Sequence, residues 1–238
     1  MLPLLIAHRC GPDIYPEQSI ASARHALSLG ADFVEMDIQY TSDGVPVICH
    51  DPNTARIFGV DCLVKDMTFA QFMTLRHVSD SSYPSHSLHD VLISGVSPIL
   101  FHCKISGEPL NDLVRCIVSH GFEKQCVIGV LYAEDAERIK SLCKDIRVLA
   151  FMPKLEQLDS FLSGPTEIIR LWENWVTPER VSRVRAAGKQ LWIMAGSPTE
   201  KGVGYTCEES MRWWMQLGVD GILVNDIRWA KQIVKRNG

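Results

Sequence analysis

No stretch of the sequence approaches the roughly 20 consecutive apolar residues that a membrane-spanning helix needs, so we expect no membrane span. Long runs of lysine and arginine are also missing, and the 24 basic and 28 acidic residues give a formal net charge of −4. A mildly acidic chain of this kind binds nucleic acid and anionic membranes poorly, so neither is expected among its partners. Residues 1–7 are apolar but lack the basic leader and the cleavage signature of a secretory signal.

Cys-x-x-Cys pairs are absent among the eight cysteines, which argues against zinc-ribbon and thioredoxin types of site. A chain of 238 residues is too large to need disulfide staples. Several cysteines, Cys49 and Cys126 among them, lie inside apolar runs, where a reduced thiol behaves as a small hydrophobic side chain. The cysteines therefore predict a cytoplasmic protein in a reducing environment.

Short apolar runs alternate with stretches of helical periodicity along the whole chain. Eight runs are expected to be strands: residues 4–8, 33–39, 99–104, 126–130, 147–151, 167–171, 191–194 and 221–224. Alternating strands and helices predict an α/β protein with parallel strands joined by helical crossovers. Eight such units in 238 residues fit a (β/α)8 TIM barrel better than an open doubly wound sheet, which is the alternative. No linker divides the chain, so residues 1–238 are expected to form a single domain.

One stretch departs from this alternation. Between Asp37 and His50 the chain is too short for a crossover helix, and Asp43-Gly44 separates two extended runs. This dipeptide favours a two-residue hairpin with a type I′ turn. In an unbulged hairpin the numbers of paired residues have a constant sum, which places His50 opposite Asp37. The carboxyl ends of barrel strands carry the chemistry, so the hairpin is expected to bring a histidine to that end.

Charged residues gather at the expected strand ends. Glu35 and Asp37 are two residues apart on one strand and share a face, and His102 and Lys104 are spaced in the same way. Two carboxylates that converge inside a barrel are unfavourable unless a cation neutralises them, and oxygen ligands favour Mg²⁺ or Ca²⁺. Taken alone, each of these residues is more often structural or solvated, so their joint placement is what favours a site.

Four segments near the amino terminus form an ordered set of motifs. They are residues 6–9 (Ile-Ala-His-Arg), 16–19 (Pro-Glu-Gln-Ser), 30–37 (Gly-Ala-Asp-Phe-Val-Glu-Met-Asp) and 41–51 (Thr-Ser-Asp-Gly-Val-Pro-Val-Ile-Cys-His-Asp). In this order and spacing they resemble the glycerophosphodiester phosphodiesterase family, and weaker similarity continues through residues 87–92, 191–192 and 218–222. The resemblance implies a TIM barrel with a β-hairpin and a small insertion after the second strand, here about residues 51–85.

The resemblance also implies roles for residues at the strand ends. His8 and His50 match the general acid/base pair of the family, and Glu35 and Asp37 match two ligands of a divalent metal. The residue types suit these roles, because imidazole titrates near neutral pH and can exchange protons with both oxygens of the reaction. A metal at the two carboxylates would make the nucleophile more acidic and orient the phosphate.

Further residues match the part of the family site that binds substrate. Arg9 and Lys104 match the groups that bind the phosphate, and a phosphodiester anion does need positive charge around its oxygens. Glu17 matches the glutamate of the family's Pro-Glu-Asn motif, with Gln18 in place of the asparagine. Trp192 matches an aromatic residue of the substrate pocket.

The sequence departs from the family at the third metal ligand. Where the family has a glutamate two residues before the lysine, this chain has His102. A neutral nitrogen ligand suits Mn²⁺ or Zn²⁺ better than Mg²⁺ or Ca²⁺, and one negative charge is lost from the site. Two interpretations remain open at this stage, in which His102 either ligates the metal or only packs and forms hydrogen bonds nearby.

The function implied by the resemblance is metal-assisted hydrolysis of glycerophosphodiesters to glycerol 3-phosphate and an alcohol. In the family, the glycerol 2-hydroxyl is thought to attack first, and water then opens the cyclic phosphate. The substrate partner is thus expected to be a small-molecule phosphodiester. Two alternatives remain: a cyclising lyase of the sphingomyelinase D type and a non-catalytic barrel that binds a phosphodiester. The sequence leaves the alcohol group, the metal and the oligomeric state open.

Overall fold

The computed structural model describes residues 2–198 and 202–237. At its centre lies a closed barrel of eight parallel strands, in which β1 pairs with both β2 and β9 and so closes the sheet. The barrel strands are β1 (Leu4–Ala7), β2 (Phe33–Tyr40), β4 (Ile99–Cys103), β5 (Cys126–Val130), β6 (Arg147–Ala150), β7 (Ile168–Trp172), β8 (Gln190–Met194) and β9 (Gly221–Val224). The prediction of a (β/α)8 barrel is confirmed.

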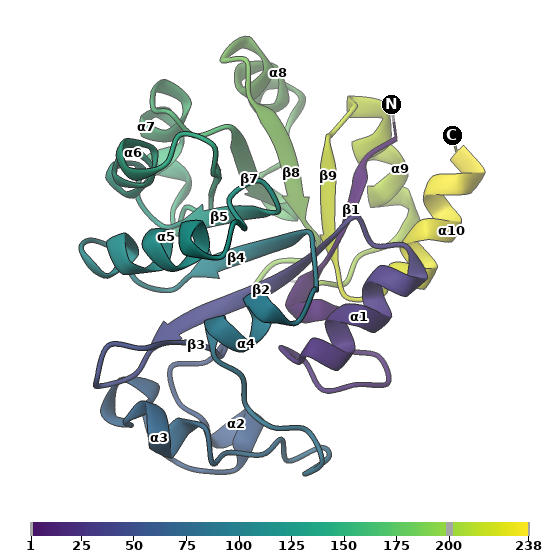
Figure 1. Cartoon of the computed structure of the whole chain (residues 1–238). Helices are drawn as coiled ribbons and strands as arrows, with labels where there is room; N and C mark the ends of the chain where they lie inside the picture. Colours follow the sequence, from purple (N-terminus) through teal and green to yellow (C-terminus); the bar gives the residue numbers. More distant parts are fainter. Residues whose placement is uncertain (1, 199–201, 238) are drawn as a thin grey trace.

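Helices surround the barrel strands (Figure 1). They are α1 (Ile20–Leu29), α4 (Leu88–Ile93), α5 (Pro109–Ser119), α6 (Ala133–Leu142), α7 (Leu158–Ser163), α8 (Pro178–Ala186), α9 (Glu208–Leu217) and α10 (Ile227–Asn237). In α5 the buried side chains are three and four residues apart, as a helix with one buried face requires: Leu110, Leu113, Val114 and Ile117. Burial of each such side chain contributes roughly 1.5–3 kcal/mol, so this face holds the helix on the barrel.

Inward-facing side chains fill the inside of the barrel. They form one buried apolar cluster: Ile6, Leu100, Val127, Leu149, Phe151, Ile168, Trp192, Met194 and Leu223. Trp192 is fully buried in this cluster, and a side-chain carbon built on Gly221 would lie 2.8 Å from its indole ring. The next inward positions toward the carboxyl ends of β1, β2 and β4 are polar, which places the candidate site at that end of the barrel.

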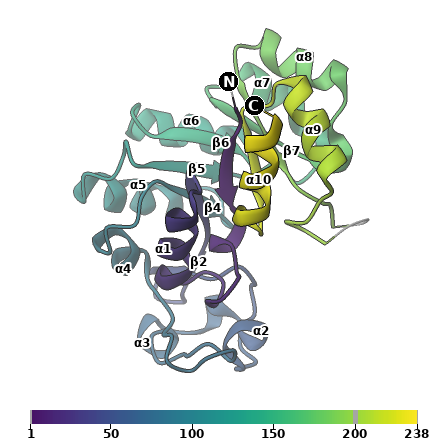
Figure 2. The ribbon, with the colours of Figure 1, turned by 90° about the vertical axis from the view of Figure 1, so that its right-hand side faces the viewer.

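The segment between β3 (Pro46–Ile48) and α4 forms a small lobe beside the barrel (Figures 1 and 2). It contains α2 (Ala55–Phe58), a short 3-10 helix (Val64–Asp66) and α3 (Phe69–Phe72). The lobe has its own apolar cluster: Val47, Cys49, Ile57, Phe58, Val64, Met67, Phe72 and Leu75. This second cluster lets the lobe hold its side chains in place next to the barrel opening. Among the helices described, none has the length and apolar character needed to cross a membrane.

The hairpin between β2 and β3 differs from the expected one. A type I′ turn needs positive φ at both central residues, and of Asp43 and Gly44 only the glycine has it, at 77°. Gly44 instead ends a wider turn in which its N–H donates to the Thr41 carbonyl at 3.0 Å. The strands therefore pair Tyr40 with Pro46. The residue numbers of each pair add up to one less than in the expected hairpin, so the pairing is shifted by one residue. The prediction that His50 pairs opposite Asp37 is wrong, and Cys49 N–H donates to the Asp37 carbonyl instead.

Candidate active site

A cavity of about 320 Å³ opens at the carboxyl ends of the barrel strands. Its lining comprises His8, Arg9, Glu35, Asp37, His50, His102, Lys104, Phe151, Arg170, Trp172, Met194, Pro198 and Val203. Seven of the nine site residues expected from the sequence are in this set, although they come from the turn after β1, from β2, from the end of β4 and from the chain beyond β3. The exceptions are Glu17 and Trp192.

Glu35, Asp37 and His102 form a compact set of metal-binding atoms. One potential ligand atom of each lies within 4.8 Å of the others. Parallel pairing of β2 and β4 places Asp37 beside His102, and His102 Nδ1 lies 3.0 Å from Asp37 Oδ1 and 3.6 Å from Glu35 Oε1. Both carboxylates are almost completely buried. Two buried carboxylates and one imidazole nitrogen suit a divalent cation, so the residues present fit the metal that the resemblance implies.

Neighbouring groups orient the two carboxylates. Gln18 donates to Asp37 Oδ2 at 2.6 Å, and the Arg9 backbone N–H donates to Glu35 Oε2 at 2.8 Å. The remaining Asp37 oxygen lies 2.7 Å from the Lys104 ammonium but has no well-aligned hydrogen bond among the described residues. Burial opposes ionisation of Asp37, but the ammonium of Lys104 and the neighbouring His102 hold its pKa well below the usual range. Asp37 is therefore an anion that still has one oxygen available to a cation.

His8 is held in one tautomer by Asn225. The Asn225 amide nitrogen donates to the Val203 carbonyl at 3.1 Å, which turns Oδ1 toward His8 Nδ1 at 2.8 Å. Because Oδ1 can only accept, Nδ1 carries the proton and Nε2 keeps its lone pair. Burial also lowers the pKa of His8, so the ring is neutral near pH 7. Gly204 permits this contact, since a side-chain carbon there would lie 2.2 Å from Asn225 Oδ1.

His50 belongs to a ring of alternating charges that joins the barrel to the lobe. Its Nδ1 lies 2.6 Å from Asp51 Oδ1, and its Nε2 lies 2.8 Å from a guanidinium nitrogen of Arg9. Asp51 accepts from Arg56, and Arg56 donates twice to Glu17, at 2.7 and 3.0 Å. Glu17 closes the ring with Arg9 at 3.6 Å. Since arginine only donates, His50 accepts at Nε2 and donates from Nδ1 to Asp51.

The backbone that presents Arg9 is strained. Arg9 and Cys10 both have positive φ, at 49° and 69°, where residues other than glycine are uncommon. Such a conformation costs of order 1–3 kcal/mol and persists only where the surroundings fix it. Here the hydrogen bond from Arg9 N–H to Glu35 and the complete burial of Cys10 fix it. The strained turn aims the Arg9 side chain toward His50 and Glu17.

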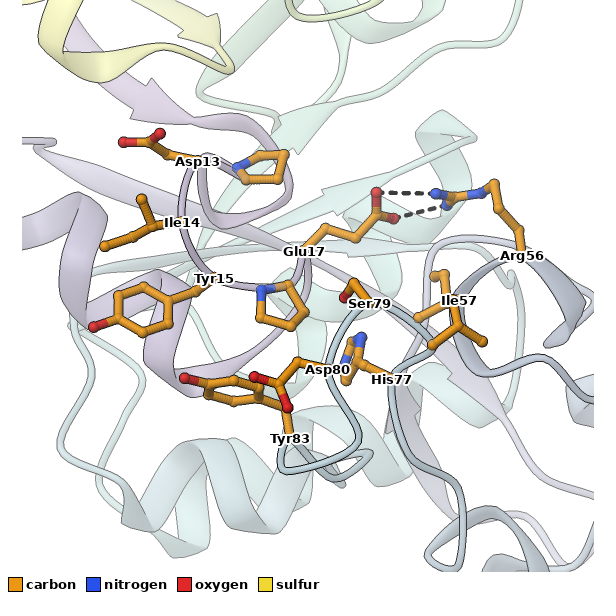
Figure 3. A pocket seen from close by; sticks show the side chains of 13 residues that line it. Asp13, Ile14, Tyr15, Glu17, Arg56, Ile57, His77, Ser79, Asp80 and Tyr83 are labelled. Atoms are coloured by element: carbon orange, nitrogen blue, oxygen red, sulfur yellow. Dashed lines mark hydrogen bonds and ion pairs between the residues drawn. The ribbon is translucent and has the colours of Figure 1, made fainter.

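Glu17 and Trp192 lie outside the cavity lining. Glu17 contacts Arg56 beside a second cavity of about 420 Å³, between residues 12–17 and the lobe (Figure 3). Although it is larger, this second cavity holds none of the metal-binding or histidine cluster, so the smaller one is the candidate active site. Trp192 lies deeper, in the barrel core, and Trp172 is the tryptophan that lines the opening.

Among the residues that the sequence did not indicate, three have clear contacts at the site: Asn225, Phe151 and Arg170. Asn225 directly follows β9, at the strand end where functional residues are expected. The Phe151 ring stacks on His102, with centroids 3.7 Å apart, and fits there because Gly129 has no side chain. Arg170 interrupts an apolar strand (Ile-Ile-Arg-Leu-Trp), and a charge inside such a run was the signal that could have revealed it.

A closed parallel barrel with histidines, carboxylates and cations at its carboxyl end defines a barrel enzyme built for an anionic substrate. The model of the glycerophosphoryl diester phosphodiesterase family matches residues 8–104. A glycerophosphodiester phosphodiesterase of Caldanaerobacter subterraneus is 25% identical over 100% of both chains. Glycerophosphodiester phosphodiesterase 1 of Rattus norvegicus is 44% identical over 70 residues, which are 29% of this chain and 21% of that protein.

Solved structures show the same fold. A phosphodiesterase of Oleispira antarctica, in complex with the product sn-glycerol-3-phosphate, superposes with a TM-score of 0.79 at 18% identity. The match covers 98% of this chain and 97% of that one. These matches agree with the resemblance to glycerophosphodiester phosphodiesterases, which are phosphoric diester hydrolases, that the motifs predicted.

Proposed function

We propose that the protein hydrolyses glycerophosphodiesters to glycerol 3-phosphate and an alcohol by general acid–base catalysis with His8 and His50. The observation that carries this proposal is that one cavity brings both histidines together with Arg9, Lys104 and a pair of buried carboxylates. Phosphodiester cleavage needs a proton acceptor, a proton donor and positive charge near the phosphate oxygens. The family match and the relatives named for this activity support the substrate class.

His8 is the base of the first step in this proposal. Its Nδ1 proton is committed to Asn225, so Nε2 accepts the proton of the glycerol 2-hydroxyl as that oxygen bonds to phosphorus. Burial disfavours the charged ring, which keeps His8 neutral and ready to accept. In the second step the protonated His8 returns this proton to the 2-oxygen when the cyclic phosphate opens.

His50 is the acid of the first step. In this step Nε2 also carries a proton, while Nδ1 donates to the Asp51 carboxylate. Two donors cannot face each other, so this protonation releases the Arg9 guanidinium from His50 Nε2. His50 then gives its proton to the alcohol oxygen as the bond from phosphorus to that oxygen breaks. Neutral His50 accepts a proton from water in the second step.

Cations around the cavity bind the phosphate. Released from His50, Arg9 offers a planar pair of donors, and Lys104 offers a compact charge beside Asp37. A divalent cation held by Glu35, Asp37 and His102 would acidify the attacking hydroxyl and orient the phosphate. Mg²⁺ or Ca²⁺ follows from the family resemblance, whereas the nitrogen of His102 favours Mn²⁺ or Zn²⁺.

We infer that the chain works as one domain, in which residues 51–85 are an insertion that completes the site. The insertion supplies Asp51, which supports His50, and Arg56, which holds Glu17 next to Arg9. We also place the protein in a reducing compartment such as the cytoplasm, because all eight cysteines are free.

The test is release of glycerol 3-phosphate from glycerophosphocholine and glycerophosphoethanolamine. Metal-stripped protein is assayed with Mg²⁺, Ca²⁺, Mn²⁺ and Zn²⁺ added separately. His8→Ala and His50→Ala are expected to abolish turnover while the circular dichroism spectrum is retained. His89→Ala is the control, because this exposed histidine lies on α4, outside the cavity lining, and contacts His120. Full activity in either cavity variant would contradict the acid–base assignment.

The same assay separates the two alternative functions. Accumulation of a cyclic glycerophosphate without glycerol 3-phosphate would identify a cyclising lyase. Tight binding of uncleaved substrate with every one of the four cations would identify a non-catalytic binding protein.

A further inference from the structure

Arg170 is a buried charge that the proposed reaction does not use. It lies on β7, and the strand order places β7 opposite β2, the strand that carries Glu35 and Asp37. Only 3% of its surface is exposed, yet it lines the active-site cavity. It is therefore aimed into the cavity from the side that faces the carboxylates.

The Arg170 guanidinium contacts aromatic rings. It lies 4.3 Å from the ring centre of Trp172, 5.0 Å from that of Phe151 and 5.9 Å from that of Trp175. Contact with ring faces supplies no hydrogen-bond acceptor of the carbonyl or carboxylate kind to the guanidinium N–H groups. The rings thus fix the guanidinium without satisfying its hydrogen bonds.

Two of the three guanidinium nitrogens of Arg170 lack an acceptor among the described residues. Nε and Nη1 are buried and have no hydrogen-bond partner in the part of the chain that the structure describes. Burial lowers the pKa of Arg170 to about 9, which leaves it charged at neutral pH. The charge of Glu35 acts on Arg170 and favours its charged form, but no hydrogen bond joins the two side chains among the described residues. A buried cation without a hydrogen-bonded anion is unfavourable, and an arginine fork matches the geometry of a carboxylate or phosphate. An anionic group of a ligand is the partner that this site lacks.

The cavity has two unlike halves. Arg9, Lys104, the histidines and the carboxylates all come from β1 to β4 and are already paired with one another. On the other half the lining is Phe151, Arg170, Trp172, Met194, Pro198 and Val203. Among the described lining residues of this second half, Arg170 is the one that is charged. A phosphate held by Arg9 and Lys104 would leave the apolar half to another part of the substrate.

We propose that Arg170 selects glycerophosphodiesters whose leaving alcohol carries an anionic group, a carboxylate or a second phosphate. This inference rests on the proposed function. Glycerol itself is uncharged, so the anion that pairs with Arg170 belongs to the other alcohol. Cationic alcohols such as choline are disfavoured for two reasons: Arg170 repels them, and it already covers the ring faces that would bind an ammonium group.

The test compares substrates that differ by one anionic group. Glycerophosphoserine is glycerophosphoethanolamine with an added carboxylate, and glycerophosphoglycerol phosphate is glycerophosphoglycerol with an added phosphate. The wild-type enzyme is expected to show a kcat/KM at least about tenfold higher for the anionic member of one pair, mainly through a lower KM. The pair that shows this preference tells whether the group recognised is a carboxylate or a phosphate.

Substitution of Arg170 assigns the preference to this side chain. Arg170→Met keeps a long apolar side chain against the rings. In this variant the ratio of kcat/KM between the two substrates of a pair is expected to be close to one. Arg170→Lys keeps the charge without the planar fork, so part of the preference remains, and it serves as the second variant should Arg170→Met fold poorly. Arg147→Met is the control, because Arg147 lies at the start of β6, away from the cavity, and bonds to Gln190.

Three results would overturn the inference. One is equal kcat/KM for both members of each pair in the wild type, and another is preference for the uncharged or cationic member. The third is an Arg170→Met variant in which kcat/KM falls by the same factor for both substrates of a pair, since Arg170 would then bind the phosphate that both substrates share. If no substrate is cleaved, the proposed function fails, and calorimetric binding of the same pairs still decides whether Arg170 selects the anion.

Discussion

Replacing Asn225 by leucine tests how the fold sets the proton-accepting nitrogen of His8. The variant removes the 2.8 Å contact between Asn225 Oδ1 and His8 Nδ1 while keeping the side-chain volume. One hydrogen bond contributes a net of about 0.5–1.5 kcal/mol. Since each 1.36 kcal/mol is a factor of ten, loss of the favoured tautomer is expected to lower kcat/KM by about 2- to 12-fold.

The pH profile gives a sharper readout of the same contact. His8 acts as a base when neutral, so activity falls as the pH drops through its pKa. Burial lowers this pKa from 6.5, which places the corresponding acid limb of kcat/KM below that value. Asn225→Asp adds a carboxylate beside the ring and raises the pKa, so the acid limb is expected to move to higher pH.

Stopped assays of glycerol 3-phosphate release between pH 4 and about 9 measure both effects, a range that spans the ordinary histidine pKa. Asn111→Leu is the matched control, because Asn111 lies on α5 and bonds weakly to Arg138 on the outside of the barrel. The reasoning is refuted if Asn225→Leu keeps wild-type kcat/KM, or if Asn225→Asp leaves the acid limb where it was.

Other residues give further predictions. His102→Glu should shift the preferred cation toward Mg²⁺ or Ca²⁺, measured by activity of metal-stripped protein, and an unchanged preference would remove His102 from the metal site. Gly129→Ala places a carbon 2.3 Å from the Phe151 ring, so the free energy of unfolding in urea should fall by about 1–3 kcal/mol. Unchanged stability would contradict that close contact. Arg56→Gln breaks the ring of charges at the lobe and should lower kcat without changing the metal preference; a change in preference would instead tie Arg56 to the metal site.

Local patterns were enough to predict the strands and the barrel. The apolar runs are short, and each observed strand begins and ends within one residue of its run. The count of eight alternating units then favoured a closed barrel, which the pairing of β1 with β2 and β9 confirms.

The carboxyl-end cluster could also be anticipated, because alternation along a strand decides which side chains face inward. Glu35 and Asp37 face His102 for this reason, and parallel pairing of β2 with β4 brings them level. The motif segments covered only the first half of the barrel. They could not indicate Arg170, on β7 across the barrel from β2, or Asn225, which follows β9 and reaches His8 only when β9 pairs with β1.

The pairing register of the β2–β3 hairpin and the depth of Trp192 in the barrel were harder to predict. A single left-handed glycine at the turn shifted the hairpin by one residue, and the Asp-Gly dipeptide alone does not distinguish the two turns. Trp192 faces inward as expected, but it lies one layer below the cavity because Gly221 leaves room for its ring there. How deep Trp192 lies depends on Gly221, a residue of another strand, and the periodicity of one strand cannot predict such a contact.

The most direct test of the account follows phosphorus during turnover. Phosphorus NMR of glycerophosphoserine and glycerophosphoethanolamine, mixed with protein and one divalent cation, distinguishes substrate, cyclic phosphate and glycerol 3-phosphate. The wild type is expected to convert substrate to glycerol 3-phosphate, and His8→Ala and His50→Ala are expected to convert none. Unchanged substrate with all four cations, or equal conversion by the histidine variants, would contradict the claim that these two histidines cleave a glycerophosphodiester.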